Sequence, residues 1–133
     1  MSHDTNIEEV RMLQGVLIAE SLRVGAQLTG IPLQIDKLSR VEMTDPGDDQ
    51  PRHWTLLEFT AEESTAQRLA DLLSSCLASS GGWYTDFHTA DETFVIFANK
   101  VFRYPRGQAE GRSEAQQYGR SVGVPEAQLD WQV

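Results

Sequence analysis

Asp86 and His88 are the two residues whose types and spacing could carry out acid and base chemistry. They stand two positions apart in a segment expected to be a strand, so both side chains leave the same face, with backbones about 7 Å apart. In a catalytic interpretation the His88 imidazole transfers a proton, and Asp86 or Asp91 orients the imidazole or stabilises its charge. An anionic centre is then held by Tyr84, Tyr104 or Arg103. The same pattern on a strand more often reflects a hydrogen-bonded histidine beside a solvated aspartate.

This segment also predicts a binding surface, because aromatic rings offer contact area and polar tips orient a bound guest. The predicted ligand-binding residues are Tyr84, Asp86, His88, Phe97 and Tyr104. The sequence therefore predicts first a non-catalytic module that binds a small ligand or another protein, without a cofactor. A small acid and base enzyme that uses His88 with Asp86 is the alternative.

A third hypothesis is a divalent-metal-binding protein with Asp86, His88 and His53 as ligands. It requires the strand that holds His53 to lie alongside the other two residues. The spacing of these residues matches no metal-binding signature, so this hypothesis ranks last and no metal ligands are assigned.

Three consecutive strands between Trp83 and Tyr104 are the elements that must position these side chains. The run 93–98 is too short for a helix and rich in aromatic and β-branched residues, which favours a strand covered on both faces. Asparagine tolerates the left-handed conformation, so Asn99–Lys100 are predicted to form a turn. With that turn, Phe97 is expected to pair with Phe102.

The segment 83–88 is expected to run antiparallel on the other side of this run, with His88 opposite Thr93. Since side chains alternate between the faces of a sheet, the side chains of the three strands form two surfaces. One is apolar and is the better core candidate: Trp83, Thr85, Phe87, Phe94, Ile96 and Val101, with Arg103 at its margin. The other is aromatic and polar: Tyr84, Asp86, His88, Val95, Phe97, Phe102 and Tyr104.

Residues 1–14 are predicted to be an extension or a short helix, and residues 16–23 a strand, with a continued helix as the open alternative. The residues that recur at helical spacing are Ile7, Val10, Leu13 and Leu17. Residues 33–43 predict an extended segment, and the change of phase between Ile35 and Leu38 indicates a bulge. Residues 44–52 predict a loop because they are rich in proline, glycine and aspartate.

Residues 53–60 predict a further strand, followed by a helix that ends before Ser80 and has Thr60 or Ser64 as its N-cap. The stripe with which this helix would cover the sheet contains Ala66, Leu69, Ala70, Leu73, Cys76 and Leu77. A second helix is expected over residues 110–122, and residues 129–131 are expected to fold back onto the body.

The predicted fold is a single α+β domain over residues 1–133, with a mostly antiparallel sheet of five or six strands and two main helices.

The composition narrows the classes of function. A formal net charge of −9 argues against a nucleic-acid partner, because phosphate neutralisation needs clustered Lys and Arg. The chain has no apolar run of membrane-spanning length and no pattern of a secretion signal, so a soluble cytoplasmic protein without a membrane partner is expected. The single cysteine, Cys76, is expected to be an inert core residue. A sheet face that the helices leave uncovered predicts either the interface of a homodimer, which is the expected state, or a ligand surface.

Several stretches resemble a family of small uncharacterised actinobacterial proteins, a domain of unknown function. The stretches that carry the resemblance are ESLRVG, IPLQIDKLSRVE, WYTDFHTADETFVIFANKVFRYPRG, AEGR and YGRSVGVPEAQLDW, within residues 16–131. The resemblance implies a strand over residues 16–23 and an extension peculiar to this chain over the first dozen residues. It implies no reaction, cofactor or catalytic residue.

Overall fold

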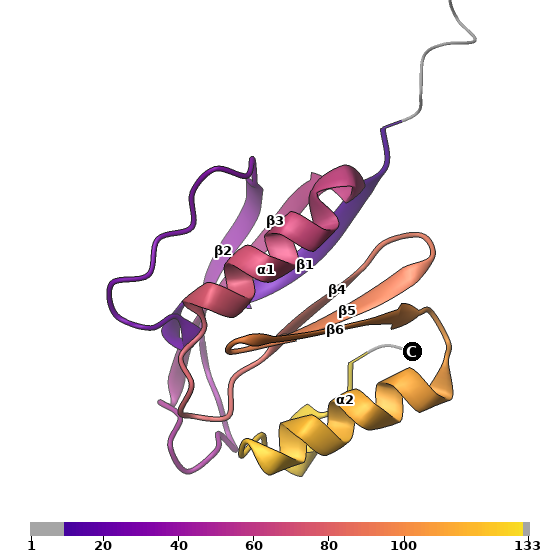
Figure 1. The fold of residues 1–133 in the computed structure, drawn as a ribbon. Helices are drawn as coiled ribbons and strands as arrows, with labels where there is room; N and C mark the ends of the chain where they lie inside the picture. The colour runs from indigo at the N-terminus through magenta and orange to yellow at the C-terminus, as the bar shows by residue number, and fades with distance from the viewer. Residues whose placement is uncertain (1–9, 132–133) are drawn as a thin grey trace, which may run out of the picture.

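The computed structural model describes residues 10–131 and shows six strands in one antiparallel sheet with two helices (Figure 1). The predicted α+β class is therefore confirmed. The elements are β1 (Met12–Ile18), β2 (Gln34–Glu42), β3 (His53–Glu62), α1 (Ala66–Cys76), β4 (Thr85–His88), β5 (Glu92–Phe97), β6 (Lys100–Pro105) and α2 (Ala109–Ser121). Neither helix of this described part is long and apolar enough to cross a membrane.

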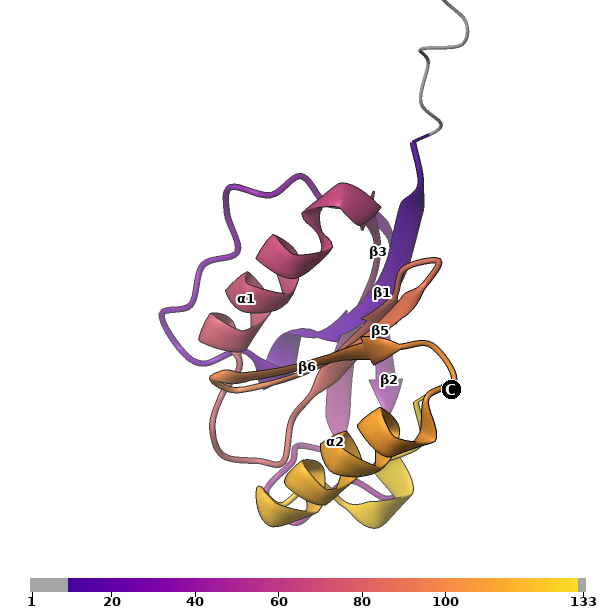
Figure 2. The ribbon, with the colours of Figure 1, turned by 45° about the vertical axis from the view of Figure 1, so that its right-hand side comes forward.

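The sheet consists of two halves that meet between β1 and β4. The strand order is β2-β3-β1-β4-β5-β6, and all neighbours are antiparallel. β1 pairs with β3 along its whole length, whereas its ladder with β4 consists of the single pair Gly15 and Phe87. The two halves therefore diverge on either side of this pair, as the different directions of β1 and β5 show (Figure 2).

The first core lies between the sheet and α1. The predicted apolar stripe of this helix is confirmed, because all of its members are buried. It packs against side chains from both halves of the sheet: Leu13, Leu17, Phe59, Ala61, Phe87, Phe94 and Ile96. Cys76 is buried, at 2% exposure, as expected for a core thiol.

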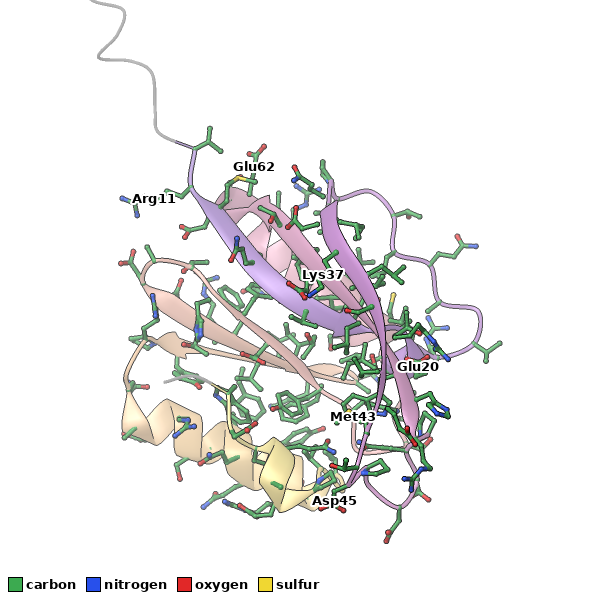
Figure 3. All side chains as sticks on the ribbon, turned by 180° about the vertical axis from the view of Figure 1, so that it is seen from behind. Arg11, Glu20, Lys37, Met43, Asp45 and Glu62 are labelled. Atoms are coloured by element: carbon green, nitrogen blue, oxygen red, sulfur yellow. The ribbon has the colours of Figure 1, made fainter. Side chains whose placement is uncertain are left out.

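The second core lies on the opposite face and covers the β4–β5–β6 half alone. The helix α2 and the residues after it pack there, and the predicted return of residues 129–131 is confirmed. The buried members of this core are Val95, Phe97, Tyr104, Ala115, Val124, Leu129 and Trp131. On the same side, no helix among the described residues crosses β1, β2 and β3 (Figure 3).

The central ribbon has the predicted faces but not the predicted register. His88 lies opposite Thr93, as expected. Phe97, however, pairs with Lys100 and not with Phe102, because the turn is made by Ala98 and Asn99. This shift of two positions keeps the side chains of β4, β5 and β6 on their predicted faces.

Contacts with α1 explain where the turn forms. Asn99 adopts the left-handed conformation with φ 61°, and its backbone N–H donates to the Ser74 carbonyl at 3.0 Å. The Ser74 hydroxyl in turn donates to the Phe97 carbonyl at 2.9 Å. The helix therefore holds the turn one position earlier than the local sequence pattern indicates.

The N-terminal part of the described chain is a strand from Met12 onward, so the helical alternative is wrong over Met12–Ile18. Leu13 and Leu17 misled the prediction because a spacing of four keeps two residues on one face in a helix and in a strand alike. The strand also ends earlier than expected, since Ala19–Ser21 form a short 3-10 turn. The part of the predicted helix in residues 1–9 lies outside the described residues.

The bulge is confirmed, because the pairing of β2 with β3 shifts between Ile35 and Lys37. The N-cap prediction for α1 is wrong. Thr60 stays within β3, where its hydroxyl donates to the Asp36 carboxylate, and the helix begins at Ala66 after a 3-10 turn over Glu63–Thr65. The tertiary strand pairing outweighs the local capping pattern here.

Candidate functional site

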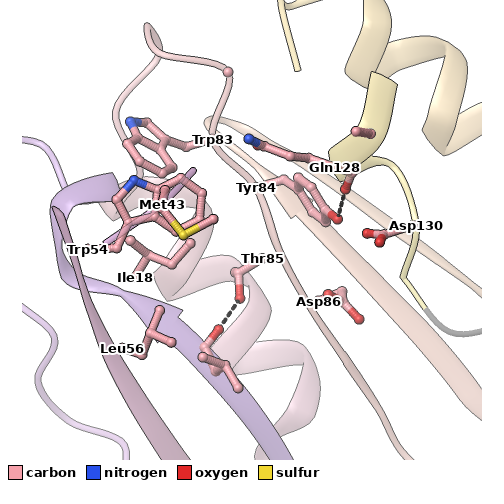
Figure 4. Close-up of a pocket in the computed structure, with 13 residues that line it drawn as sticks. Ile18, Met43, Trp54, Leu56, Trp83, Tyr84, Thr85, Asp86, Gln128 and Asp130 are labelled. Carbon is pink, nitrogen blue, oxygen red and sulfur yellow. Dashed lines mark hydrogen bonds between the residues drawn. The ribbon is translucent and has the colours of Figure 1, made fainter. Parts of the chain in front are cut away.

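A cleft of about 370 Å³ lies where the two halves of the sheet diverge, beside the segment that follows α2 (Figure 4). It is bounded by β1, β3, the start of β4 and residues 127–130. The side chains around it are Val16, Ile18, Met43, Trp54, Leu56, Trp83, Tyr84, Thr85, Asp86, Ala127, Gln128 and Asp130. Its size is within the range of small-ligand pockets, which begins at about 300 Å³.

The cleft is open because α2 covers only the β4–β5–β6 half of this sheet face. The Thr85 hydroxyl donates to the Val16 carbonyl at 3.0 Å, so a side chain takes the place of a ladder bond between β1 and β4. Val16 remains 45% exposed on the open side. An exposed apolar side chain next to a concave surface is typical of a site that receives another molecule.

Two tryptophans form one apolar end of the cleft. Trp54 at the start of β3 and Trp83 before β4 meet edge to face, with ring centroids 5.3 Å apart. Trp54 is also held by its indole N–H, which donates to the Pro51 carbonyl at 2.8 Å. Trp83 thus packs on Trp54 and is not part of the first core, where the sequence pattern placed it.

The wall opposite β1 is held by the chain after α2. The Tyr84 hydroxyl donates to the Gln128 carbonyl, and the Gln128 side chain donates to the Gln50 side chain at 2.9 Å. Gln50 is 7% exposed and donates to the Gly81 carbonyl at 2.9 Å. These bonds tie the loop before β3, the entry to β4 and the C-terminal segment together, so the wall is fixed in place.

Two carboxylates, Asp86 and Asp130, line the cleft (Figure 4). Burial, and to a smaller extent repulsion from the Asp130 charge, together raise the pKa of Asp86 to about 6. Asp130 itself is exposed. Within residues 10–131, neither hydrogen bonds nor basic side chains lower the pKa of Asp86. The carboxylate therefore carries its charge at neutral pH in a partly desolvated place.

Tyr84 is a neutral hydrogen-bond donor in this site. Burial raises the pKa of its phenol well above the ordinary value, and the charges of Asp86 and Asp130 act in the same direction. A phenol with a raised pKa does not serve as a base near neutral pH. Its ring stacks edge to face on Trp131 at 5.3 Å, which fixes its position.

His88 shares a face with Asp86, as predicted, but its ring contacts Thr93. The imidazole Nδ1 lies 3.1 Å from the Thr93 hydroxyl oxygen. Burial lowers the pKa of His88, and the nearby Arg106 charge lowers it further. Because His88 is bonded to Thr93 and is not a lining residue of the cleft, the structure gives the catalytic pair of His88 with Asp86 no shared hydrogen bond.

Phe97 and Tyr104, the other two residues predicted to bind a ligand, lie beneath α2. They are 1% and 5% exposed, and the Tyr104 hydroxyl accepts a hydrogen bond from the Trp131 indole at 2.8 Å. Of the predicted ligand-binding residues, Tyr84 and Asp86 thus line the cleft, and His88, Phe97 and Tyr104 do not.

The structure does not assemble the predicted metal ligands. In the described chain no group of three or more His, Cys, Asp and Glu side chains could hold a metal ion. His53 begins β3, opposite Glu42 of β2, and thus belongs to the other half of the sheet from His88.

Sequence reasoning missed most of the cleft. Alternation along residues 53–60 places Trp54 and Leu56 on one face, but nothing in the sequence shows that this face borders Asp86. Asp130 stands between Leu129 and Trp131, which are both buried, and this position between two apolar residues is the signal that an acid is held against the body.

The chain matches no family model, no curated protein and no solved structure.

Proposed function

We propose that this protein is a non-catalytic module that binds a small molecule with an apolar body in the cleft between the two halves of the sheet. One observation carries this proposal. The cleft combines apolar side chains from β1 and β3 with a few polar groups at the entry to β4, and it stays open beside a wall that internal hydrogen bonds hold in place.

The lining suits a small guest. Ile18 and Leu56 stand on neighbouring strands in direct register, and Trp54 extends this apolar surface toward Trp83. Apolar contact supplies affinity, while a small number of polar groups such as the Asp86 carboxylate set the orientation of the guest. A catalytic role is less favoured, because the His88 imidazole on this face is hydrogen-bonded to Thr93.

The test is a small-fragment screen followed by protein-observed NMR. Fragments that bind should shift the amide signals of Val16, Leu56 and Thr85 together, because these residues border the cleft from three strands. Val16→Trp, which projects a large ring into the open side, should abolish the shifts. The matched control Gln14→Trp is on the same exposed face of β1 but outside the lining of the cleft, and it should preserve them.

A screen in which no fragment shifts these signals, or in which Val16→Trp and Gln14→Trp bind equally well, would overturn the proposal. Intact folding of both variants is established by their amide spectra. Because Gln14 and Val16 are exposed, neither substitution disturbs a core.

Self-association is a second candidate, favoured by the exposed apolar side chains of β1. Met12 and Val16 are 48% and 45% exposed on the sheet face that α2 leaves open. A second copy placed there would cover both side chains. Sedimentation velocity should then show a dimer at micromolar concentration that Met12→Lys dissociates, whereas a monomer over the whole concentration range would overturn this candidate.

A further inference from the structure

The cleft contains a negative charge for which the described residues provide no counter-charge. Asp86 is partly buried, and its pKa is governed by desolvation and by the second carboxylate, Asp130. Leaving a carboxylate in such a place costs free energy unless a donor or a cation compensates it. A ligand that brings a positive charge would supply this compensation.

The basic side chain that acts on the two neighbouring phenols, Arg112, is engaged with Trp131. Arg112 of α2 donates through Nη2 to the Trp131 carbonyl at 2.7 Å, and its guanidinium lies over the Trp131 ring, 5.9 Å from the centroid. Its charge lowers the pKa of Tyr84 and Tyr104 but is not among the influences on Asp86. Among the described residues, the charged and titratable groups around Asp86 are thus Asp130, the two neutral phenols, the His88 imidazole that contacts Thr93, and Arg112, which is engaged with Trp131.

The rest of the cleft lining favours a ligand with an apolar body. Beyond the carboxylates and the polar side chains of Tyr84, Thr85 and Gln128, the lining is apolar, with Ile18, Leu56 and the two tryptophans among its members (Figure 4). An anion would meet two like charges, and a neutral polar guest could donate a hydrogen bond to Asp86 but would leave the negative charge without a counter-charge. Charge complementarity and apolar contact together therefore restrict the class of ligand.

Resting on the proposed binding function of the cleft, we infer that its ligand is a small organic amine, whose ammonium group lies between Asp86 and Asp130 and whose apolar body lies against Leu56 and Trp54. An ammonium group donates hydrogen bonds to both carboxylates and removes their mutual repulsion. The aromatic surfaces of Tyr84 and Trp83 border the same space and can contact either end of the guest.

The test compares three probes of nearly equal shape: phenethylamine, phenethyl alcohol and hydrocinnamate. Each is titrated into the full chain and followed by the amide signals of the cleft. Both phenethylamine and the alcohol can donate a hydrogen bond to Asp86, but only the ammonium group carries a charge opposite to that of the two carboxylates. Phenethylamine should therefore bind at least about tenfold more tightly than the alcohol, and hydrocinnamate should bind least. Asp86→Asn should abolish the preference for the amine, whereas Asp48→Asn, in an exposed loop, should keep it.

The pH dependence provides a second readout. Asp86 has a pKa of about 6 in the folded protein, so phenethylamine affinity should fall as the pH drops below this value and Asp86 becomes protonated. The affinity for phenethyl alcohol should change little over the same range.

The outcomes separate this inference from the proposed function. Equal or tighter binding of the alcohol or of hydrocinnamate in the cleft would overturn the amine inference and leave the binding function in place. Amine binding that Asp86→Asn and Asp48→Asn weaken alike would also overturn it, since that result indicates general attraction to an acidic surface. If none of the probes shifts the cleft signals at millimolar concentration, the inference is wrong, and the fragment screen then decides the proposed function.

Discussion

Trp54 and Trp83 meet edge to face with their ring centroids 5.3 Å apart, and this contact joins the two halves of the sheet at one end of the cleft. Trp54 comes from the start of β3, whereas Trp83 precedes β4. Both rings are buried, at 6% and 7% exposure. The pair therefore contributes to stability and to the shape of the proposed binding site.

Replacing Trp83 should destabilise the protein strongly. Trp83→Ala is expected to lower the free energy of unfolding by about 3 to 5 kcal/mol, as is usual for the loss of a buried aromatic ring. In a double-mutant cycle with Trp54→Ala, the interaction free energy between the two rings should be about 0.5 to 1.5 kcal/mol, in addition to what each ring contributes by its burial. Urea unfolding of the single and double variants measures both quantities, and strictly additive effects would show that the two rings do not interact.

Asp86 should make the protein less stable as the pH rises. The pKa of Asp86 is about 6 in the folded chain, against an ordinary value of 3.8 in the unfolded chain. Between pH 3.8 and pH 6 the folded state therefore binds more protons at this group than the unfolded state does. The free energy of unfolding contributed by this group must then fall as the pH increases through that window. Asp86→Asn removes this effect and should stabilise the protein at neutral pH by on the order of 2 kcal/mol.

The measurement is urea unfolding of the wild type, Asp86→Asn and Asp48→Asn at a series of pH values. The stability advantage of Asp86→Asn should shrink as the pH approaches 3.8, and Asp48→Asn should follow the wild type. If NMR titration of the Asp86 carboxyl gives a pKa at or below the ordinary value, then the site is not desolvated as the structure indicates.

Gly15 should not tolerate a side chain, because β1 passes close to the Phe59 ring there. A Cβ atom at Gly15 would come within 2.6 Å of the Phe59 ring, which is 2% exposed and held in the first core. Gly15→Ala is expected to cost about 1 to 3 kcal/mol through overpacking. Thermal unfolding, with the exposed neighbour substituted in Gln14→Ala as a control, measures this cost; equal melting temperatures would contradict it.

Much of the fold was predictable because it follows from local patterns. The alternation of side chains along β4, β5 and β6 predicts the face of each residue in these strands, and the stripe from Ala66 to Leu77 predicts the helix on the first core. Register was less predictable. The turn at Asn99 depends on hydrogen bonds with Ser74, and a contact between distant segments leaves no local signal.

The candidate site was predictable in part for the same reason. Tyr84 and Asp86 were identified because ring and carboxylate stand on one face of a strand. Val16, Leu56 and Asp130 were not, because they approach Asp86 only through the strand order and the return of the C-terminal segment. The sequence likewise does not indicate that α2 covers Phe97 and Tyr104 but leaves the β1 side open.

The most direct test of the binding role is a crystal structure of the protein grown with a saturating concentration of phenethylamine. The phenethylamine ring should lie against Leu56 and Trp54. Its amine nitrogen should lie within hydrogen-bond distance of the Asp86 carboxylate, with Asp130 as the second neighbour. A structure in which the cleft stays empty at that concentration, or in which the amine binds at another surface while Asp86 faces only solvent, would contradict this binding role.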